Sequence, residues 1–120
     1  MPTPTITTGY TLTYPPISDR PPMAVRFTVA PDDKGTWTVE RQAHGAAGRI
    51  LGGDQPRRYY GDEAQVRAEG AYRGLVVREV LHLGQMLDLA LDPRDIRFID
   101  GVPTLDGMDA GQWLDAVGTG

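Results

Sequence analysis

Glu79 and His82 are the two residues of this sequence that come closest to catalytic chemistry. They lie three positions apart in a stretch with helical periodicity, so we expect both side chains on the same side of a helix. An imidazole that is oriented by a carboxylate can act as a general base. The same spacing is more often a solvated or interfacial ion pair, so we name no catalytic residue and predict that the protein is not an enzyme.

Carboxylates that could bind a metal ion lie near this pair and follow it in the chain. Glu79 and His82 with Asp88 or Asp92 would form a small ligand set, but the spacing matches no established zinc pattern. Spaced aspartates also suit Ca²⁺ or Mg²⁺. The candidates are Asp88, Asp92, Asp95, Asp100, Asp106 and Asp109. No EF-hand loop fits them, and turns or a helix cap account for nearly all of them, so we predict no metal site and no cofactor.

One short patch combines basic and aromatic side chains. It consists of Arg57, Arg58, Tyr59 and Tyr60, directly before a predicted helix start, and Arg49 could join it. Helix N-termini favour phosphate, and Arg with Tyr can clamp and stack a nucleotide or a single strand. Two acidic residues already occupy this helix start, and the glycine-rich stretch before it lacks the P-loop lysine and the dinucleotide-binding spacing. Nucleic-acid or nucleotide binding is therefore the alternative function.

Nucleophilic catalysis has little support in the sequence. Ser18 is the only serine, it lies between two proline pairs, and no Gly-x-Ser-x-Gly motif surrounds it. The chain contains no cysteine, which excludes a thiol nucleophile, a thiolate metal site and a disulfide framework.

Composition and charge narrow the class of protein. A chain of 120 residues is one ordinary domain, so residues 1–120 are treated as a unit. The formal charge of −4 and the pI near 5.0 argue against sequence-independent binding of nucleic acid. The sequence has no apolar run long enough to cross a membrane, and its N-terminus lacks the features of a secretion signal. We expect a cytoplasmic protein with no membrane partner.

Alternating hydrophobicity predicts antiparallel strands in the first half of the chain. Residues 5–14 alternate within an extended, proline-rich N-terminal arm at 1–22. Residues 24–30 and 36–41 alternate as well, and the Pro-Asp-Asp-Lys-Gly sequence between them has turn chemistry. These two segments are therefore expected to form a hairpin.

The glycine-rich stretch 43–61 is the hardest to assign. Residues 49–51 and 57–60 could be short strands that continue the sheet, and the alternative is a flexible loop. A loop of this length would be unusual within a compact domain, so at least one short strand is favoured here.

The main helix is predicted at 62–91. Asp62, with Gln65 three positions on, is the acidic analogue of a capping box, and Asp92-Pro93 disfavours continuation. Thirty helical residues would span about 45 Å, more than the roughly 35 Å diameter expected of a compact domain of this length. The helix should therefore either break at Gly84 or project into a partner.

A hairpin at 96–105 and a short helix at 109–117 are expected to complete the chain. Asp100-Gly101 has the composition of a two-residue hairpin turn. Pro103 lacks a backbone N–H and so predicts an edge strand, and Asp109 is the expected cap of the last helix.

The apolar surface of the main helix is wider than one sheet would cover. Val77 and Leu81 extend it toward a second side. Either the C-terminal helix and the N-terminal strand cover this side, or it forms the seam of a homodimer. The first strand could also pair with another chain by strand addition, through Tyr10 and Leu12. These four residues are the predicted interface.

The predicted fold class is α+β: an antiparallel sheet, formed by the N-terminal strand and β-hairpins, packs against one long α-helix, with a short C-terminal helix. The wide apolar helix and the scarcity of catalytic residue types predict a small non-enzymatic protein-binding or assembly module, which self-associates or binds a protein partner. The other hypotheses are a nucleic-acid-binding regulator and a small enzyme with Glu79 and His82 in one pocket.

Overall fold

The computed structural model describes residues 8–15, 23–45, 49–53 and 55–118 of the chain. It confirms the α+β class, with an antiparallel sheet, one long helix and a short C-terminal helix. In chain order the elements are β1 (Thr8–Tyr14), β2 (Met23–Pro31), β3 (Trp37–His44), β4 (Ile50–Gly53), β5 (Arg57–Tyr59), α1 (Ala64–Met86), the 3₁₀ turn η2 (Pro93–Asp95), β6 (Arg97–Ile99), β7 (Val102–Leu105), β8 (Met108–Asp109) and α2 (Ala110–Gly118).

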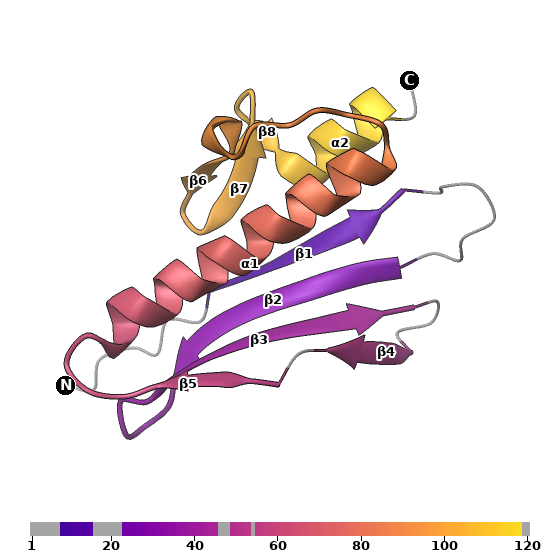
Figure 1. Ribbon diagram of the computed structural model, residues 1–120. Coiled ribbons are helices and arrows are strands. Elements are labelled where there is room, and N and C mark those ends of the chain that lie inside the picture. Colours follow the sequence, from indigo (N-terminus) through magenta and orange to yellow (C-terminus); the bar gives the residue numbers. More distant parts are fainter. Residues whose placement is uncertain (1–7, 16–22, 46–48, 54, 119–120) are drawn as a thin grey trace.

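The main sheet has the order β1-β2-β3-β4, and β5 also pairs with β3 (Figure 1). β2 and β3 form the hairpin that the sequence predicts, with Val29 opposite Val39. β1 pairs antiparallel with β2 and places Leu12 opposite Val25. The predicted strand residues 5–7, and most of the proline-rich connector that ends the 1–22 arm, lie outside the described residues.

The two faces of this sheet differ because each strand alternates apolar and polar side chains. α1 and α2 pack on one face (Figure 1). The buried sheet residues on that face are Tyr10, Leu12, Tyr14, Val25, Phe27, Val29 and Val39. The opposite face carries exposed polar side chains such as Thr11, Arg26 and Gln42.

β4 and β5 together form one interrupted strand along the outer edge of β3. β5 pairs with residues 37–39 and β4 pairs with residues 42–44, with a register shift between Ala43 and His44. At least one short strand was expected in the glycine-rich stretch, and both candidate segments contain one. A side chain at Gly53 would collide with the carbonyl oxygen of Arg41, so the close approach of β4 to β3 requires glycine there.

α1 begins at Ala64, two residues later than the sequence predicts. Glu63 occupies the N-cap position without a capping hydrogen bond from its side chain, and the predicted Asp62 capping box is wrong. The physical reason is a backbone turn: Gly61 adopts a φ of +89°, and its carbonyl accepts a hydrogen bond from the Ala64 amide at 3.2 Å.

The end of α1 at Met86 corrects the predicted end at 91, and it has a local cause. Asp88 adopts the left-handed conformation, with a φ of 63°. The amides of Asp88 and Leu89 then donate to the carbonyls of Gln85 and Gly84, at 3.1 and 2.8 Å. This is a Schellman motif with aspartate in the usual glycine position. Gly84 does not break the helix, and it allows Leu91 to pack closely against the last turn.

The length of α1 also removes the expected overhang. Its 23 residues span about 34 Å. The molecule is elongated and measures 49 × 31 × 22 Å. A helix of this length is shorter than the longest of these dimensions. α1 therefore does not have to extend into a partner.

β6, β7 and β8 form a second, smaller antiparallel sheet beside α1 (Figure 1). The predicted turn Asp100-Gly101 connects β6 and β7, with positive φ at both residues. β7 is the central strand, so the edge prediction from Pro103 is wrong. Proline is tolerated because the two-residue β8 pairs only with Thr104 and Leu105 and does not reach Pro103.

The cap predicted for the last helix is confirmed. Asp109 accepts a hydrogen bond from the Gln112 amide at 3.1 Å. The same carboxylate accepts one from the Tyr10 hydroxyl at 3.1 Å, and that hydroxyl accepts one from the Gly111 amide at 3.0 Å. These contacts attach β1 to the start of α2.

The buried tyrosines predict a loss of stability at high pH. Burial raises the pKa of Tyr72 to about 12, and its hydroxyl donates to the Gly101 carbonyl at 3.0 Å. The folded state therefore favours the neutral form of Tyr72. The contribution of this residue to the free energy of unfolding is complete below pH 10 and is lost as the pH rises from 10 towards 12. The free energy of unfolding, measured with denaturant between pH 8 and 11.5, should fall above pH 10. In Tyr72→Phe this fall should be shallower but still present, because burial raises the pKa of Tyr10 as well. An unchanged pH dependence in Tyr72→Phe would contradict this explanation.

Candidate functional site

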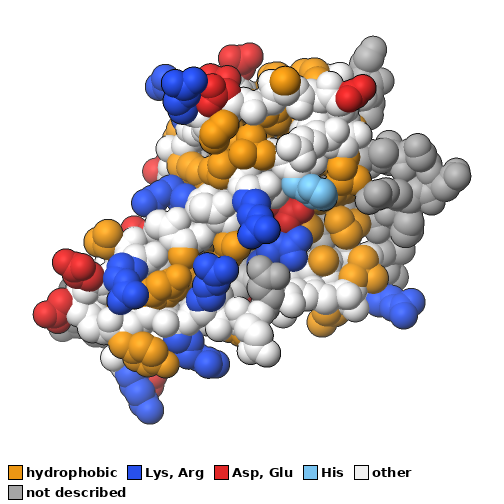
Figure 2. Space-filling view, in the orientation of Figure 1, with side chains coloured by type: hydrophobic (Ala, Val, Ile, Leu, Met, Phe, Trp, Pro, Cys, Tyr) orange, Lys and Arg blue, Asp and Glu red, His pale blue; other side chains and the backbone are white. Residues whose placement is uncertain are grey.

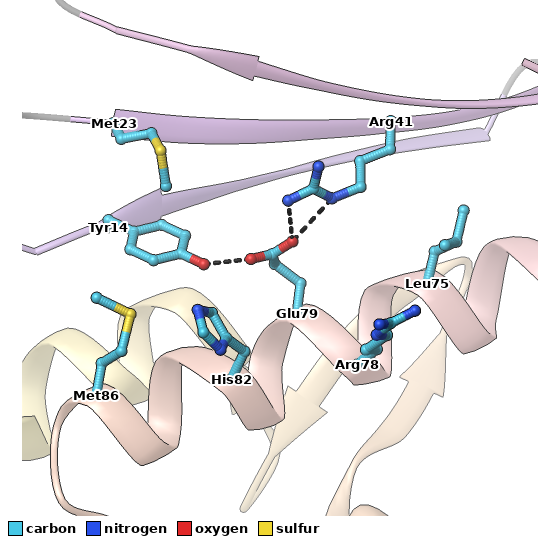
Figure 3. Close-up of a pocket in the computed structure, with 8 residues that line it drawn as sticks. All are labelled: Tyr14, Met23, Arg41, Leu75, Arg78, Glu79, His82 and Met86. Carbon is cyan, nitrogen blue, oxygen red and sulfur yellow. Dashed lines mark hydrogen bonds and ion pairs between the residues drawn. The ribbon is translucent and has the colours of Figure 1, made fainter. Parts of the chain in front are cut away.

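A buried carboxylate joins α1 to the main sheet. Glu79, from the middle of α1, is only 7% exposed. One of its oxygens, Oε1, accepts hydrogen bonds from Nε and Nη2 of Arg41 on β3, at 2.9 and 2.6 Å. The other oxygen accepts a hydrogen bond from the Tyr14 hydroxyl at the end of β1. Three elements that are distant in the sequence therefore meet at one side chain (Figure 3).

Strand and helix periodicity place these three residues together. Tyr14 continues the buried positions of β1, and Arg41 follows Val39 on the covered face of β3, opposite Phe27. Glu79 lies on the buried side of α1. A charge at such a position is tolerated only when it is paired and hydrogen-bonded, and both oxygens of Glu79 have partners.

This network forms one side of a cavity between α1 and the sheet. The cavity has a volume of about 410 Å³. Its lining residues are Tyr14, Met23, Arg41, Leu75, Arg78, Glu79, His82 and Met86 (Figure 3). Glu79 and His82 therefore share one pocket, as the enzyme hypothesis requires, but the Glu79 oxygens are bonded to Tyr14 and Arg41. The carboxylate does not orient the imidazole, so the pair lacks the geometry of a general base with its orienting partner.

The described residues that line the cavity carry a net positive charge. The charge of Glu79 is balanced by that of Arg41. Arg78 and His82 are exposed and, within the described parts of the chain, form no hydrogen bond or ion pair. Figure 2 shows basic and histidine side chains grouped around an acidic one in the middle of this face. The arrangement therefore offers a cation to an incoming ligand rather than a carboxylate.

Arg78 and His82 belong to a longer stripe on one flank of α1. Side chains at i, i+4, i+8, i+11 and i+15 lie on the same side of a helix. The residues at these positions are Arg67, Ala71, Leu75, Arg78 and His82, and we call them the basic stripe. Arg67 lies over the ring of Tyr59 on β5, 5.3 Å from its centroid, so the stripe follows the side of α1 that faces β5 and β3.

The structure divides the basic–aromatic patch that the sequence suggested. Successive strand residues point to opposite faces, so Arg57 and Tyr59 share the α1 side of the sheet, whereas Arg58 is on the other side. Tyr60 follows β5 and is 66% exposed. Arg49 precedes β4, near the opposite end of β3. The five residues therefore do not form one compact surface, and Tyr59 is already stacked with Arg67.

The four predicted interface residues occupy two environments. Tyr10 and Leu12 are buried in the core of this chain, at 8% and 0% exposure, because α2 covers β1. Their side chains therefore offer no surface to a partner, which corrects their assignment as contact residues. Among the described strands β1 is an edge strand of the main sheet, so strand addition through its backbone stays a prediction. Val77 and Leu81 are half-buried and pack against the same core, so its own chain covers this side of α1 only in part.

The aspartates have local roles where their contacts are described. Asp92 caps η2, Asp100 forms a hairpin turn and Asp109 caps α2. Among the described residues, no three His, Asp or Glu side chains come together as ligands for a metal ion. Within the same residues, neither α1 nor α2 combines the length and hydrophobicity of a transmembrane segment.

Comparisons with known proteins add no functional assignment. No protein-family model matches the chain, and no curated protein or solved structure is significantly similar to it.

The sequence contained two signals for the network that we did not use. Arg41 occupies a position with the parity of Trp37 and Val39, on the apolar side of its strand, and Glu79 lies among the apolar positions of its helix. A charged residue at each of two facing apolar positions indicates a buried ion pair. Met23, Tyr14 and Met86 could not be assigned to the cavity without the tertiary arrangement.

Replacing Glu79 with leucine should destabilise the protein strongly. The change leaves the mostly buried Arg41 without this partner, which we expect to lower the free energy of unfolding by about 3 kcal/mol. Glu69→Leu is the matched control on the same helix, because Glu69 is half-buried and its hydrogen bond from Gln65 is exposed. We expect its effect to stay within about 0.5 kcal/mol.

A double-mutant cycle measures the pair itself. The free energy of unfolding is measured with denaturant for Glu79→Leu, Arg41→Leu and the double variant. The loss in the double variant should be smaller than the sum of the two single losses, by about 1 kcal/mol or more. Additive effects would show that the two side chains do not stabilise the fold as a pair.

Proposed function

We propose that the protein is a small non-enzymatic binding module that holds an acidic, partly apolar segment of a partner protein along the basic stripe of α1. One observation supports this most directly: on a chain with a net charge of −4, the exposed charged side chains of α1 are all basic or histidine. They are Arg67, Arg73, Arg78 and His82.

The acidic residues of α1 do not offset this charge. Glu79 is buried and paired with Arg41. Glu69 is half-buried and accepts a hydrogen bond from Gln65 at 3.2 Å. The exposed side of the helix therefore attracts negative charge, although the whole protein is acidic, and complementary charge favours an acidic partner.

The shape and composition of the basic stripe favour a protein segment over nucleic acid. It extends over about 22 Å, from Arg67 to His82, which is the length of four helical turns. Ala71 and Leu75 lie between the cations and are half-buried, so they offer apolar contact in the middle of the stripe. Proteins that bind nucleic acid through the backbone commonly neutralise several more phosphates than these few cations could.

The proposal is for binding without catalysis. Glu79 is fully engaged with Tyr14 and Arg41, and His82 has no orienting partner among the described residues. The described lining residues of this cavity include no second acid–base pair. The site is therefore equipped to hold a group in place rather than to move a proton.

A display library of random 15-residue segments tests the docking proposal. Selected segments should be enriched in Asp and Glu, with apolar residues between them, because Ala71 and Leu75 lie between the cations at the two ends of the stripe. Their affinity, measured by fluorescence anisotropy, should fall about tenfold or more in the Arg67→Gln, Arg78→Gln double variant. Arg73→Gln, on the other flank of α1, should leave the affinity nearly unchanged.

Three results would overturn the docking proposal. The first is a selected set without acidic bias, and the second is a set whose binding is insensitive to the double variant. The third is a labelled single-stranded oligonucleotide that binds more tightly than the selected segments and loses binding in the double variant, which would assign the stripe to nucleic acid instead.

Self-association is a second candidate, supported by a different side of α1. Val77 and Leu81 are half-buried, Val66 is 70% exposed, and Gly70 has no atom within 4 Å of the position of an added Cβ. Two copies could therefore approach closely along this side, and α1 would serve as the assembly element that the sequence suggested.

Light scattering after size exclusion tests this second candidate. If α1 pairs with a second copy, the measured mass should rise with concentration, and Gly70→Gln should abolish this rise. The variant should keep or raise the thermal unfolding temperature, because glycine is a poor helix former and a side chain at position 70 would meet no other atom. A constant monomer mass up to about 100 μM would reject self-association, since it would place the dissociation constant well above that concentration.

A further inference from the structure

We infer that the cavity between α1 and β1–β3 is a binding site for a small aliphatic molecule with an anionic headgroup, either a carboxylate or a phosphate. Its volume of about 410 Å³ lies within the range of small-molecule sites. This inference concerns a free ligand, and it does not depend on the docking of a protein segment to the basic stripe.

The polar side of the cavity is fixed before any ligand enters. Arg41, Glu79 and Tyr14 hold one another through three hydrogen bonds, and Glu79 is 7% exposed. Burying a charged pair is costly, and no gain in stability over apolar packing follows from it. A rigid polar wall is, however, a feature that can orient a ligand in a pocket.

The other walls supply apolar contact. Met23 comes from the start of β2, and Leu75 and Met86 come from α1 (Figure 3). All three are half-buried and pack against the core. Methionine has no branch and adapts its shape to what it contacts, so two methionines across one cavity suit a flexible hydrocarbon chain.

Two exposed cationic or polar groups, which have no partner among the described residues, also line the cavity. Arg78 and His82 are exposed and make no hydrogen bond or ion pair in the described structure. Because Arg41 already balances Glu79, the net charge of the described lining residues is positive. The sign of this charge selects an anionic headgroup over a cationic one, and the guanidinium of Arg78 can donate two parallel hydrogen bonds to a carboxylate or phosphate.

The four methionines allow binding to be observed inside and outside the cavity in one spectrum. Protein labelled with ¹³C at the methionine methyl groups should be titrated with octanoate and, separately, with octyl phosphate. We expect saturable shifts of the Met23 and Met86 signals and little change at Met108, which lies on β8 and does not line the cavity. The anion that binds with the higher affinity identifies the preferred headgroup.

Three further probes separate the contributions of charge and chain. Acetate lacks the chain, 1-octanol lacks the charge, and octylamine reverses it. Each should bind at least about tenfold more weakly than the better anion, because each loses apolar burial or the charge-assisted hydrogen bond.

Arg78→Gln and Arg73→Gln form a matched pair on the two flanks of α1. Both residues are exposed and neither has a described partner, so both variants should keep the fold. Arg78→Gln should lower the affinity for the preferred anion about tenfold, and Arg73→Gln should leave this affinity unchanged. The inference would be overturned if the Met23 and Met86 signals did not shift at millimolar anion, or if Met108 shifted as much as they do. It would also be overturned if octylamine bound as tightly as the better anion, or if the two variants changed the affinity equally.

Discussion

The placement of the long helix on the sheet depends on the buried carboxylate of Glu79. It is the only point at which α1, β1 and β3 are joined by polar contacts of described side chains, through Tyr14 and Arg41. The buried apolar residues of α1 turn one side of the helix towards the sheet, although each such contact is not directional. Hydrogen bonds to one carboxylate have defined directions, so this network restrains the rotation and the position of α1 within that packed arrangement.

The same constraint explains the chemistry of the surface. Since Glu79 is paired with Arg41, it neither orients His82 nor neutralises Arg78. The flank of α1 next to the sheet is therefore basic on a chain of net negative charge. The cavity between Tyr14, Met23 and Met86 lies where this flank meets the ends of the strands. Both proposals, protein docking along the stripe and binding of a small anion in the cavity, depend on the pairing of the Glu79 carboxylate with Arg41 within the protein.

Local sequence signals were sufficient for most of the fold. Alternation predicted β2 and β3, and Asp100-Gly101 predicted the turn between β6 and β7, because both depend on neighbouring residues alone. Asp106-Gly107 forms a second turn with positive φ and produces β8, although we did not use that signal. The end of α1 could not be predicted, since Asp88 adopts a left-handed conformation that glycine or asparagine more often takes.

The site was predictable only in part, because it is formed by contacts between distant elements. Glu79 and His82 lie on one helix, as predicted, and they share the pocket that only the enzyme hypothesis required. The partners of Glu79 lie 65 and 38 positions before it, at Tyr14 and Arg41. Tyr10 and Leu12 looked available for a partner because nothing in their own segment shows that α2 covers them. A contiguous basic patch was likewise divided by the alternation of β5.

The exchange of arginine side-chain protons with water tests the central role of Glu79 most directly. In a ¹H–¹⁵N spectrum at neutral pH, the Nε–H of Arg41 should exchange much more slowly than that of Arg78 or Arg73, because Glu79 Oε1 accepts it at 2.9 Å in a largely buried setting. The slow exchange should disappear in Glu79→Leu. An Arg41 Nε–H that exchanges as fast as those of the two exposed arginines would contradict the account, since α1 would then lack the contact that positions it.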